Sequence, residues 1–164
     1  MSDLLVRLYD LPPLAPVEAA LAGQGIGLRR ALPGDRPVVT ALARAHGSEA
    51  WAAECDAAFA RLPLACFIAI ARGTGSARAP ETLLGFACYD ATCRGFFGPE
   101  LVHPERRERG IGRALLMAAL HAMRAEGYAY AIIGWASSVE FYAKAVGATV
   151  IEGSEPGIYP PPLR

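Results

Sequence analysis

The chain has 164 residues, the size of one domain, and folding a chain of this length removes roughly 70% of its surface from water. Hydrophobic residues make up 53% of the sequence and charged residues 20%, which excludes a disordered or low-complexity protein. Sixteen Lys and Arg balance sixteen Asp and Glu, so the overall charge points neither to nucleic acid nor to an anionic membrane as a partner. We therefore expect a single domain over residues 1–164, in which any charged binding site is local.

Asp3, Arg7 and Asp10 interrupt each apolar run among the first residues, so we expect no export signal there. The longer apolar stretches, 64–71 and 114–120, are much shorter than the roughly 18 residues that a membrane helix needs. These features predict a cytoplasmic protein without a membrane span. The four cysteines form no CxxC pair and the three histidines are scattered, so we expect no metal, and reduced thiols that mostly pack in the core.

Residues 1–25 are expected to form an N-terminal extension, with a strand over 4–9 and a helix over 15–21. The core, residues 26–152, begins with a strand over 26–31 and two helices over 36–45 and 50–61. Ser48 is a suitable N-cap for the second of these helices. Two apolar stripes are predicted by helical spacing: Val38 with Leu42 on the first helix, and Trp51, Cys55 and Phe59, facing the core, on the second.

Three strands are expected next, over 65–72, 82–89 and 95–103. The first two should form an antiparallel hairpin joined by a loop over 73–80. Gly98-Pro99 lies within the third strand, and central strands tolerate proline badly, so we predict a bulge, a splay or an edge at this point. The sheet would then be interrupted where a ligand could enter.

The last third begins with a long helix over 109–126, apolar around most of its circumference and therefore mostly buried against a sheet. A strand, a helix and a strand follow, over 128–135, 139–146 and 148–152. This order of elements indicates an α+β fold whose sheet mixes antiparallel and parallel pairs. Residues 153–164 form an extended, Pro-rich tail that could cover its own sheet or join a partner's, so a homodimer stays open.

An arginine-rich turn lies between the third of these strands and the long helix. Residues 105–113 contain more positive than negative side chains, with four arginines (Arg106, Arg107, Arg109 and Arg113) and two glutamates (Glu105 and Glu108). Gly110 and Gly112 permit unusual backbone conformations and close approach of a ligand, and the first helical turn presents unpaired N–H groups. These features predict an anion site that fits a phosphate. The alternative is a solvated helix start in which the two glutamates neutralise part of the charge.

The turn carries a recognisable spacing. Arg107-x-x-Gly110-x-Gly112 resembles the (Gln/Arg)-x-x-Gly-x-(Gly/Ala) loop with which the GNAT superfamily of N-acetyltransferases holds the pyrophosphate of acetyl-coenzyme A, and Val102-x-Pro104 resembles the strand ending before it. The resemblance, to a poorly characterised bacterial branch, covers most of the chain from residue 26 to residue 152. It implies a mainly antiparallel central sheet flanked by helices on both faces, to which the N-terminal strand and helix are an addition.

A second segment strengthens the resemblance. Residues 141–147, FYAKAVG, resemble the family's Phe-Tyr-x-Lys-x-Gly segment, with one additional residue before the glycine. Ala148 replaces an aromatic residue that usually follows. Trp135 stands where family members commonly have an Asn that contacts the cofactor, with Ser137 and Ser138 as substitutes.

The resemblance implies an acyltransferase that moves an acetyl group directly from acetyl-CoA to a primary amine of a small molecule or peptide. The cofactor-binding residues that it implies are Leu101, Val102, Arg107, Arg109, Gly110, Ile111, Gly112, Arg113 and Tyr142. A backbone N–H near Leu101 or Val102 would polarise the thioester carbonyl. The alternative function is a non-catalytic acetyl-CoA-binding module with a regulatory or interaction role.

Two side chains are candidates for proton transfer. Tyr142 is the candidate general acid for the leaving thiolate, the alternative being an aromatic side chain that only packs. Glu100 is the candidate base, because it lies two residues before Val102 and so on the same face of the strand, the alternatives being a solvated glutamate and a water chain. Asp90 and His103 are weaker candidates. The sequence does not identify the acceptor amine.

Overall fold

The computed structural model describes residues 1–73 and 79–159. Its strands are β1 (Leu4–Arg7), β2 (Ile26–Arg30), β3 (Cys66–Ala71), β4 (Thr82–Tyr89), β5 (Phe96–Val102), β6 (Tyr130–Ile133) and β7 (Thr149–Val150). Its α-helices are α1 (Ala15–Ala22), α2 (Arg36–His46), α3 (Glu49–Phe59), α4 (Ile111–Ala125) and α5 (Val139–Val146). Short 3-10 turns cover Leu8–Asp10, Pro33–Asp35 and Pro104–Arg106.

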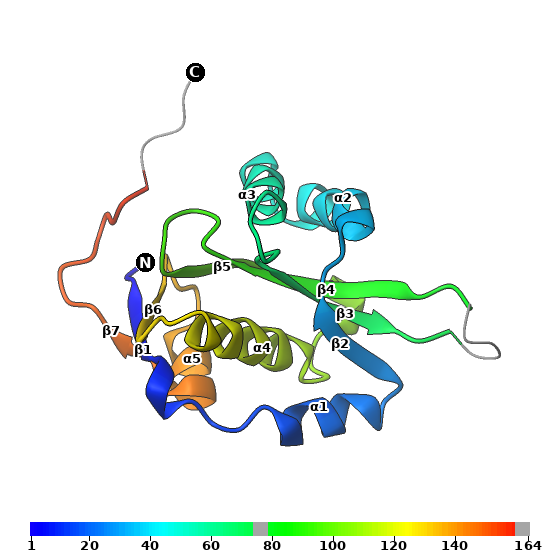
Figure 1. Cartoon of the computed structure of the whole chain (residues 1–164). Helices are drawn as coiled ribbons and strands as arrows, with labels where there is room; N and C mark the ends of the chain where they lie inside the picture. The colour runs from blue at the N-terminus through cyan, green and yellow to red at the C-terminus, as the bar shows by residue number, and fades with distance from the viewer. Residues whose placement is uncertain (74–78, 160–164) are drawn as a thin grey trace.

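The strands form a seven-stranded sheet in the order β2-β3-β4-β5-β6-β1-β7 (Figure 1). Within the described residues, every neighbouring pair is antiparallel except β5 and β6, which are parallel. This confirms the predicted mixed, mainly antiparallel sheet, and β3 with β4 forms the predicted hairpin. Residues 74–78 of the predicted connecting loop lie outside the described residues.

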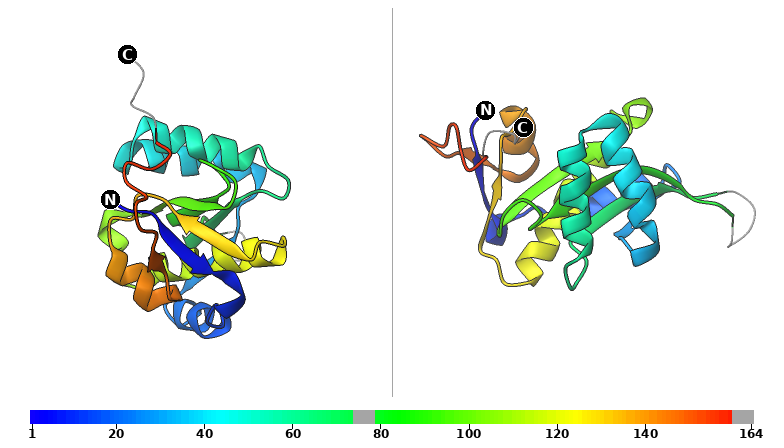
Figure 2. Two further views of the ribbon diagram at one scale, coloured as in Figure 1. Left: turned by 90° about the vertical axis from the view of Figure 1, so that its left-hand side faces the viewer. Right: turned by 90° about the horizontal axis from the view of Figure 1, so that it is seen from above.

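Helices cover both faces of the sheet. Figure 1 places α2 and α3 on one face and α1, α4 and α5 on the other, and Figure 2 shows α2 and α3 lying side by side across the strands. The predicted burial of the long helix is confirmed, because apolar side chains on most sides of α4 are inaccessible to solvent, among them Leu115, Leu116, Met117, Leu120 and Met123. Among the described residues, no helix has the length and apolarity that crossing a membrane requires.

The faces of α2 and α3 differ in part from the predicted stripes. Ser48 caps α3 as predicted, its Oγ accepting a hydrogen bond from the backbone N–H of Trp51 at 3.1 Å. Cys55 is fully buried, but Trp51 is 36% exposed, because the small residues of α3 pack on the sheet while its first turn extends over a cleft described below. On α2, Val38 is 57% exposed, and the face that packs inward carries Val39 and its helical neighbours instead.

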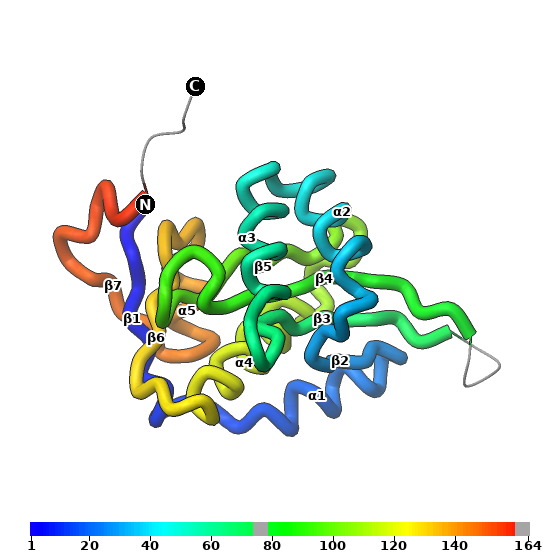
Figure 3. Tube along the Cα trace, turned by 45° about the horizontal axis from the view of Figure 1, so that its top comes forward, coloured from blue at the N-terminus to red at the C-terminus, as the bar shows by residue number. Residues whose placement is uncertain are grey.

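The N-terminal strand lies inside the sheet. β1 pairs with β6 on one side and with β7 on the other, so that Leu4 is opposite both Ile133 and Val150. Asp3 extends the connection, since its backbone N–H donates to Ser154 Oγ at 2.9 Å and its backbone oxygen accepts from Ile151 at 2.9 Å. Figure 3 shows the N-terminal residues beside the chain that follows β7. The segment predicted to be an addition therefore completes the sheet.

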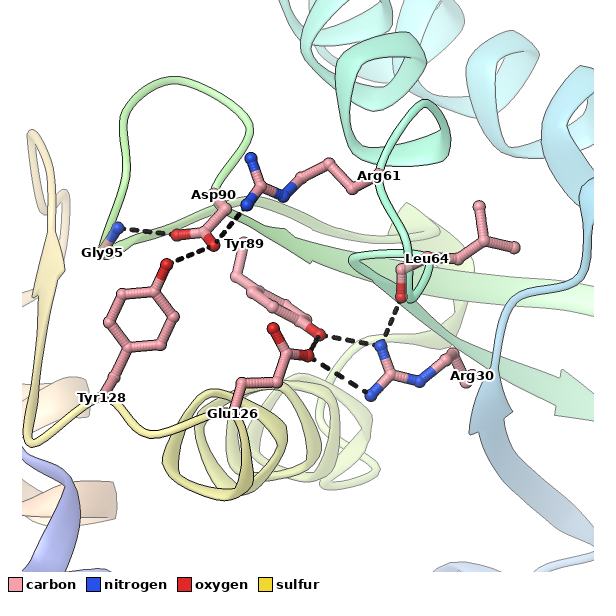
Figure 4. Close-up of polar contacts among 8 residues, drawn as sticks. All are labelled: Arg30, Arg61, Leu64, Tyr89, Asp90, Gly95, Glu126 and Tyr128. Carbon is pink, nitrogen blue, oxygen red and sulfur yellow. Dashed lines mark hydrogen bonds and ion pairs between the residues drawn. The ribbon is translucent and has the colours of Figure 1, made fainter.

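Two polar clusters fix the end of β4 (Figure 4). In the first, the buried Tyr89 accepts a hydrogen bond from Arg30 Nη1 at 2.7 Å and donates one to Glu126, and Arg30 also donates to the backbone oxygen of Leu64. This cluster connects β2, β4 and the C-terminal end of α4.

The second cluster surrounds the buried Asp90, which follows β4. Asp90 Oδ1 accepts from the backbone N–H of Gly95 at 2.6 Å, and Oδ2 accepts from Tyr128 Oη at 2.7 Å and pairs with Arg61 at 3.1 Å (Figure 4). These contacts hold the turn between β4 and β5 closed. They thereby set the residue at which β5 begins, and with it the register of the strand that carries the site.

Candidate functional site

β5 separates from β6 part way along its length. The two strands pair only at Phe96 and Phe97, and beyond Phe97 the outer edge of β5 has no partner strand in the part of the chain that the structure describes. On its other edge, Gly98 and Pro99 together face the single residue Cys88, which is a β-bulge. Gly98 has a φ of +120°, a conformation that favours glycine. The predicted bulge and splay at Gly98-Pro99 are both confirmed.

Two cavities open along the separated strands and share Trp51, Glu100 and Ser137 in their linings. The first, which we name the loop cavity, has a volume of about 510 Å³ and lies against Val102 and the loop 106–113. The second, which we name the aromatic cavity, has a volume of about 450 Å³ and lies against Trp51, Trp135 and Tyr159. Because they share wall residues, they form two halves of one cleft with Glu100 at the junction.

The loop cavity gathers most of the residues predicted to bind the cofactor. Those that line it are Leu101, Val102, Arg107, Gly110, Ile111, Gly112 and Arg113, together with Arg106, which was not among them. Arg109 instead lies over a neighbouring hollow formed with the N-terminal segment, where its backbone oxygen accepts a hydrogen bond from Gln24 at 3.3 Å. Arg113 lines both spaces.

The start of α4 gives the loop cavity its chemistry. Gly110 is the N-cap residue and has a φ of +79°, which explains why glycine is needed there. The four arginine side chains of the loop are exposed, and among the described residues none forms an ion pair with Glu105 or Glu108. The N–H groups of the first helical turn have no partner within the helix. This combination of cationic side chains and backbone donors suits a phosphate group.

The open edge of β5 directs particular backbone groups into the cleft. His103 N–H donates to the backbone oxygen of Leu84 on β4 at 2.8 Å. Backbone groups alternate along a strand, so the N–H of Leu101 also points towards β4, whereas those of Glu100 and Val102 point to the unpaired side. Of the two N–H groups predicted to polarise a carbonyl, the one on Val102 faces the cleft.

Glu100 lies beneath the first turn of α4. It shares a face of β5 with Val102, as its spacing predicts, and a Cβ added to Gly112 would lie 3.4 Å from Glu100 Oε1 and 3.6 Å from Val102 Cγ2. Oε1 is buried and has no hydrogen-bond partner among the described residues. Burial raises the pKa of Glu100 to about 8, because the carboxylate form loses its hydration. The side chain can therefore exchange a proton near neutral pH.

Tyr142 approaches the same junction from α5. It is half-buried and lines the aromatic cavity, while Phe141 beside it lines the loop cavity. Burial and, to a smaller extent, the charge of Glu100 raise the pKa of Tyr142 above the usual value of a phenol. α5 ends at Gly147 as predicted, with that residue in the left-handed conformation at φ +67°. The hydroxyl is accordingly protonated at neutral pH and available to donate.

The aromatic cavity contains a residue that the sequence patterns did not single out. Tyr159, in the tail, packs on Trp135 with ring centroids 4.6 Å apart. Trp135 has a φ of +47° and is held by two hydrogen bonds, from its backbone N–H to Asp3 Oδ1 at 3.0 Å and from Nε1 to the backbone oxygen of Pro156 at 3.0 Å. The tail carries no motif, so its aromatic residue was the only available signal.

Comparison with known proteins agrees with this geometry. The model of the acetyltransferase (GNAT) family matches residues 39–148, about two thirds of the chain. No curated protein matches the sequence significantly.

Solved structures share the fold at low sequence identity. A glucosamine N-acetyltransferase region, GCN5-related, of a fungal multi-domain β-N-acetylglucosaminidase aligns over 92% of this chain and 19% of its own, with 13% identity and a TM-score of 0.70. A GCN5-related N-acetyltransferase from Sphaerobacter thermophilus aligns over 92% of this chain and 48% of its own, with 20% identity and a TM-score of 0.66. A Drosophila protein aligns over 92% of this chain and 47% of its own, with 15% identity and a TM-score of 0.59. This chain spans less than half the length of each of the three. By its family match and its fold, the chain belongs to the GNAT family of acetyltransferases.

Proposed function

We propose that this protein is an acetyl-CoA-dependent N-acetyltransferase that moves an acetyl group directly from acetyl-CoA to a primary amine of a small molecule or peptide. The observation that carries the proposal is the cleft where β5 leaves β6, with the arginine loop along one half and Glu100 and Tyr142 at the junction. Family membership supports the same activity.

The loop cavity would hold acetyl-CoA. The molecule presents phosphate groups, and the exposed guanidinium groups of Arg106, Arg107 and Arg113 with the N–H groups after Gly110 are suited to bind them. The open backbone edge at Val102 would pair with the amides of the extended arm, as a strand pairs with a neighbour. Acetyl-CoA supplies the acyl group as a thioester, whose carbon accepts the nitrogen of an amine.

The transfer requires two proton movements, and the chain offers a group for each. Glu100, in its ionised form, would take the proton that the attacking amine loses as the nitrogen–carbon bond forms. Tyr142 would give its proton to the sulfur as the carbon–sulfur bond breaks. The N–H of Val102 would donate to the carbonyl oxygen, where negative charge develops. These roles separate binding in the loop cavity from chemistry at the junction.

The substitution Tyr142→Phe tests this separation. We expect calorimetric titration to give an acetyl-CoA Kd within about twofold of wild type, because the phosphate-binding loop is untouched, while kcat for thiol release falls about 10²-fold or more. Tyr130→Phe, at an exposed tyrosine on β6, is the matched control and should change neither quantity. Unchanged turnover in Tyr142→Phe would remove this tyrosine from the mechanism.

The titration of the wild type separates the proposal from the alternative of a non-catalytic acetyl-CoA-binding module. Binding with thiol release in the presence of amines supports the enzyme. Binding without thiol release, across polyamines, amino acids, aminoglycosides, simple amines and peptides, would favour the binding module. Absence of binding would refute both functions.

A further inference from the structure

The aromatic cavity combines rigid aromatic walls with acidic groups. Aromatic rings from five separate segments line it: Trp51, Phe97, Trp135, Tyr142 and Tyr159. Two acidic side chains, Glu54 and Glu100, lie in the same lining, which among the described residues contains no lysine, arginine or histidine. The amino group of Met1, at the rim, pairs with Glu155. The cavity thus offers negative charge and aromatic faces without a neutralising side-chain cation of its own.

Two of the aromatic walls, Trp135 and Tyr159, are held in place before any ligand binds. Both polar hydrogens of Trp135 are hydrogen-bonded, and its ring packs on Tyr159. Tyr159 in turn lies so close to Gly134 that an added Cβ there would collide with its hydroxyl oxygen, at 2.0 Å. Side chains that are already held in place lose less entropy when a ligand enters. The arrangement is therefore suited to small-molecule recognition.

The acidic groups retain unused hydrogen-bonding capacity. Glu54 accepts one hydrogen bond, from Thr92 Oγ1 at 2.6 Å, and a carboxylate has further acceptor positions. Oε1 of Glu100 is buried and has no partner among the described residues. An ammonium group at the junction would lie beside this carboxyl group and would favour its ionised form. Aromatic faces also attract a cation, when it lies within about 6 Å of the ring centroid.

We propose that the acceptor is a monocationic amine on an aromatic or apolar body that bears no carboxylate, bound with its nitrogen at Glu100 and its body between Trp51, Trp135 and Tyr159. The inference rests on the proposed function, which places the acetyl group at the same junction. A carboxylate on the ligand would face Glu54 and Glu100 and be repelled. A polyamine has no continuous apolar body to pack between the aromatic walls, so it would bury less apolar surface there.

Phenethylamine and phenylalanine provide the matched comparison, because they differ by one carboxylate. We expect kcat/KM in the thiol-release assay to be at least tenfold higher for phenethylamine than for phenylalanine, and higher than for spermidine. If phenylalanine or spermidine is acetylated as efficiently as phenethylamine, the assignment of the acceptor class is wrong even though the protein is an acetyltransferase.

A binding measurement separates the two proposals. The chain has two tryptophans, and both line the aromatic cavity, so their fluorescence reports its occupancy. Phenethylamine should change this fluorescence saturably and phenylalanine should not. Such binding without acetyl transfer would support the pocket assignment while contradicting the proposed function. Acetyl transfer to other amines with no phenethylamine binding would uphold the function and overturn the acceptor class.

Glu54→Gln tests the acidic wall without altering the junction. The variant should raise the KM for phenethylamine about three- to tenfold and reduce the discrimination against phenylalanine, because one repelling charge is gone. Glu49→Gln is the control on the same helix, since Glu49 pairs with Arg44 at 2.8 Å and does not line the cavity. Equal KM values and equal discrimination in both variants would contradict the proposed role of Glu54.

Discussion

Replacement of Glu100 by glutamine isolates the cost of ionising a buried carboxyl group. The pKa of Glu100 is raised from 4.5 to about 8 by burial, so the folded protein keeps a proton that the unfolded chain has already lost. Stability from this group is complete below pH 4.5 and is lost as the pH rises towards 8. Glutamine has a similar shape and cannot ionise, so the variant does not suffer this loss.

The size of the effect follows from the displacement of the pKa. At 1.36 kcal/mol for each pKa unit, the change from 4.5 to about 8 corresponds to at most about 5 kcal/mol. We expect the free energy of unfolding of Glu100→Gln, relative to wild type, to increase by about 2 kcal/mol or more between pH 5 and pH 8. Most of that increase should be complete near pH 8.

Urea unfolding at several pH values between 5 and 9 measures this difference directly. Any constant offset from the new amide is removed by comparing pH values rather than proteins. Glu152→Gln, at an exposed turn residue, controls for the loss of a carboxylate and should show no such gain. A difference between Glu100→Gln and wild type that stays constant from pH 5 to pH 9 would show that Glu100 is not held in its protonated form by burial.

Three further substitutions test the loop and the fold. Gly110→Ala should lower the free energy of unfolding by about 1 kcal/mol and weaken acetyl-CoA binding, because the backbone φ of this residue is +79°. The control is Gly34→Ala, since Gly34 lies in open space without a positive φ, and it should have neither effect. Tyr89→Phe should destabilise the protein by about 1–3 kcal/mol in urea unfolding, since Arg30 and Glu126 each lose a hydrogen bond to the hydroxyl of this buried tyrosine. A smaller loss would mean that the cluster contributes little. Arg107→Ala should raise the acetyl-CoA Kd about tenfold at low salt and less at high salt. Arg124→Ala, at the far end of α4, is the control and should leave the Kd unchanged. Equal effects of the two substitutions would indicate only general charge attraction.

Local sequence patterns predicted most elements of this fold. The strand at 82–89 and the helix at 139–146 have the predicted bounds, and Gly98-Pro99 marked the bulge, because backbone constraints of these two residues act locally. The expected core stripe that included Trp51 was wrong at that residue, since helical spacing defines a face but not what the face meets. Which part of the molecule a helix face contacts depends on residues far away in the sequence, so a local pattern cannot predict it.

The site was predictable where a motif marks it. The loop 106–113 was found from its spacing, and the place of Glu100 on the face of Val102 follows from strand alternation. Tyr159 was missed, because its approach to Trp135 depends on how the tail crosses the end of the sheet. The burial of Glu100 Oε1 likewise depends on the closeness of α4 at Gly112, which no pattern within β5 encodes.

The position of β1 between β6 and β7 has a consequence for biosynthesis. The strand at Leu4–Arg7 is translated long before its partners at 130–133 and 149–150, so during synthesis it must wait, unpaired, until nearly the whole domain has emerged. Contacts of such separation make late closure of the sheet the expected slow event in folding. A fragment trimmed to the matched residues 39–148 would lack β1 and leave the edge of β6 open to other chains, a ready template for aggregation.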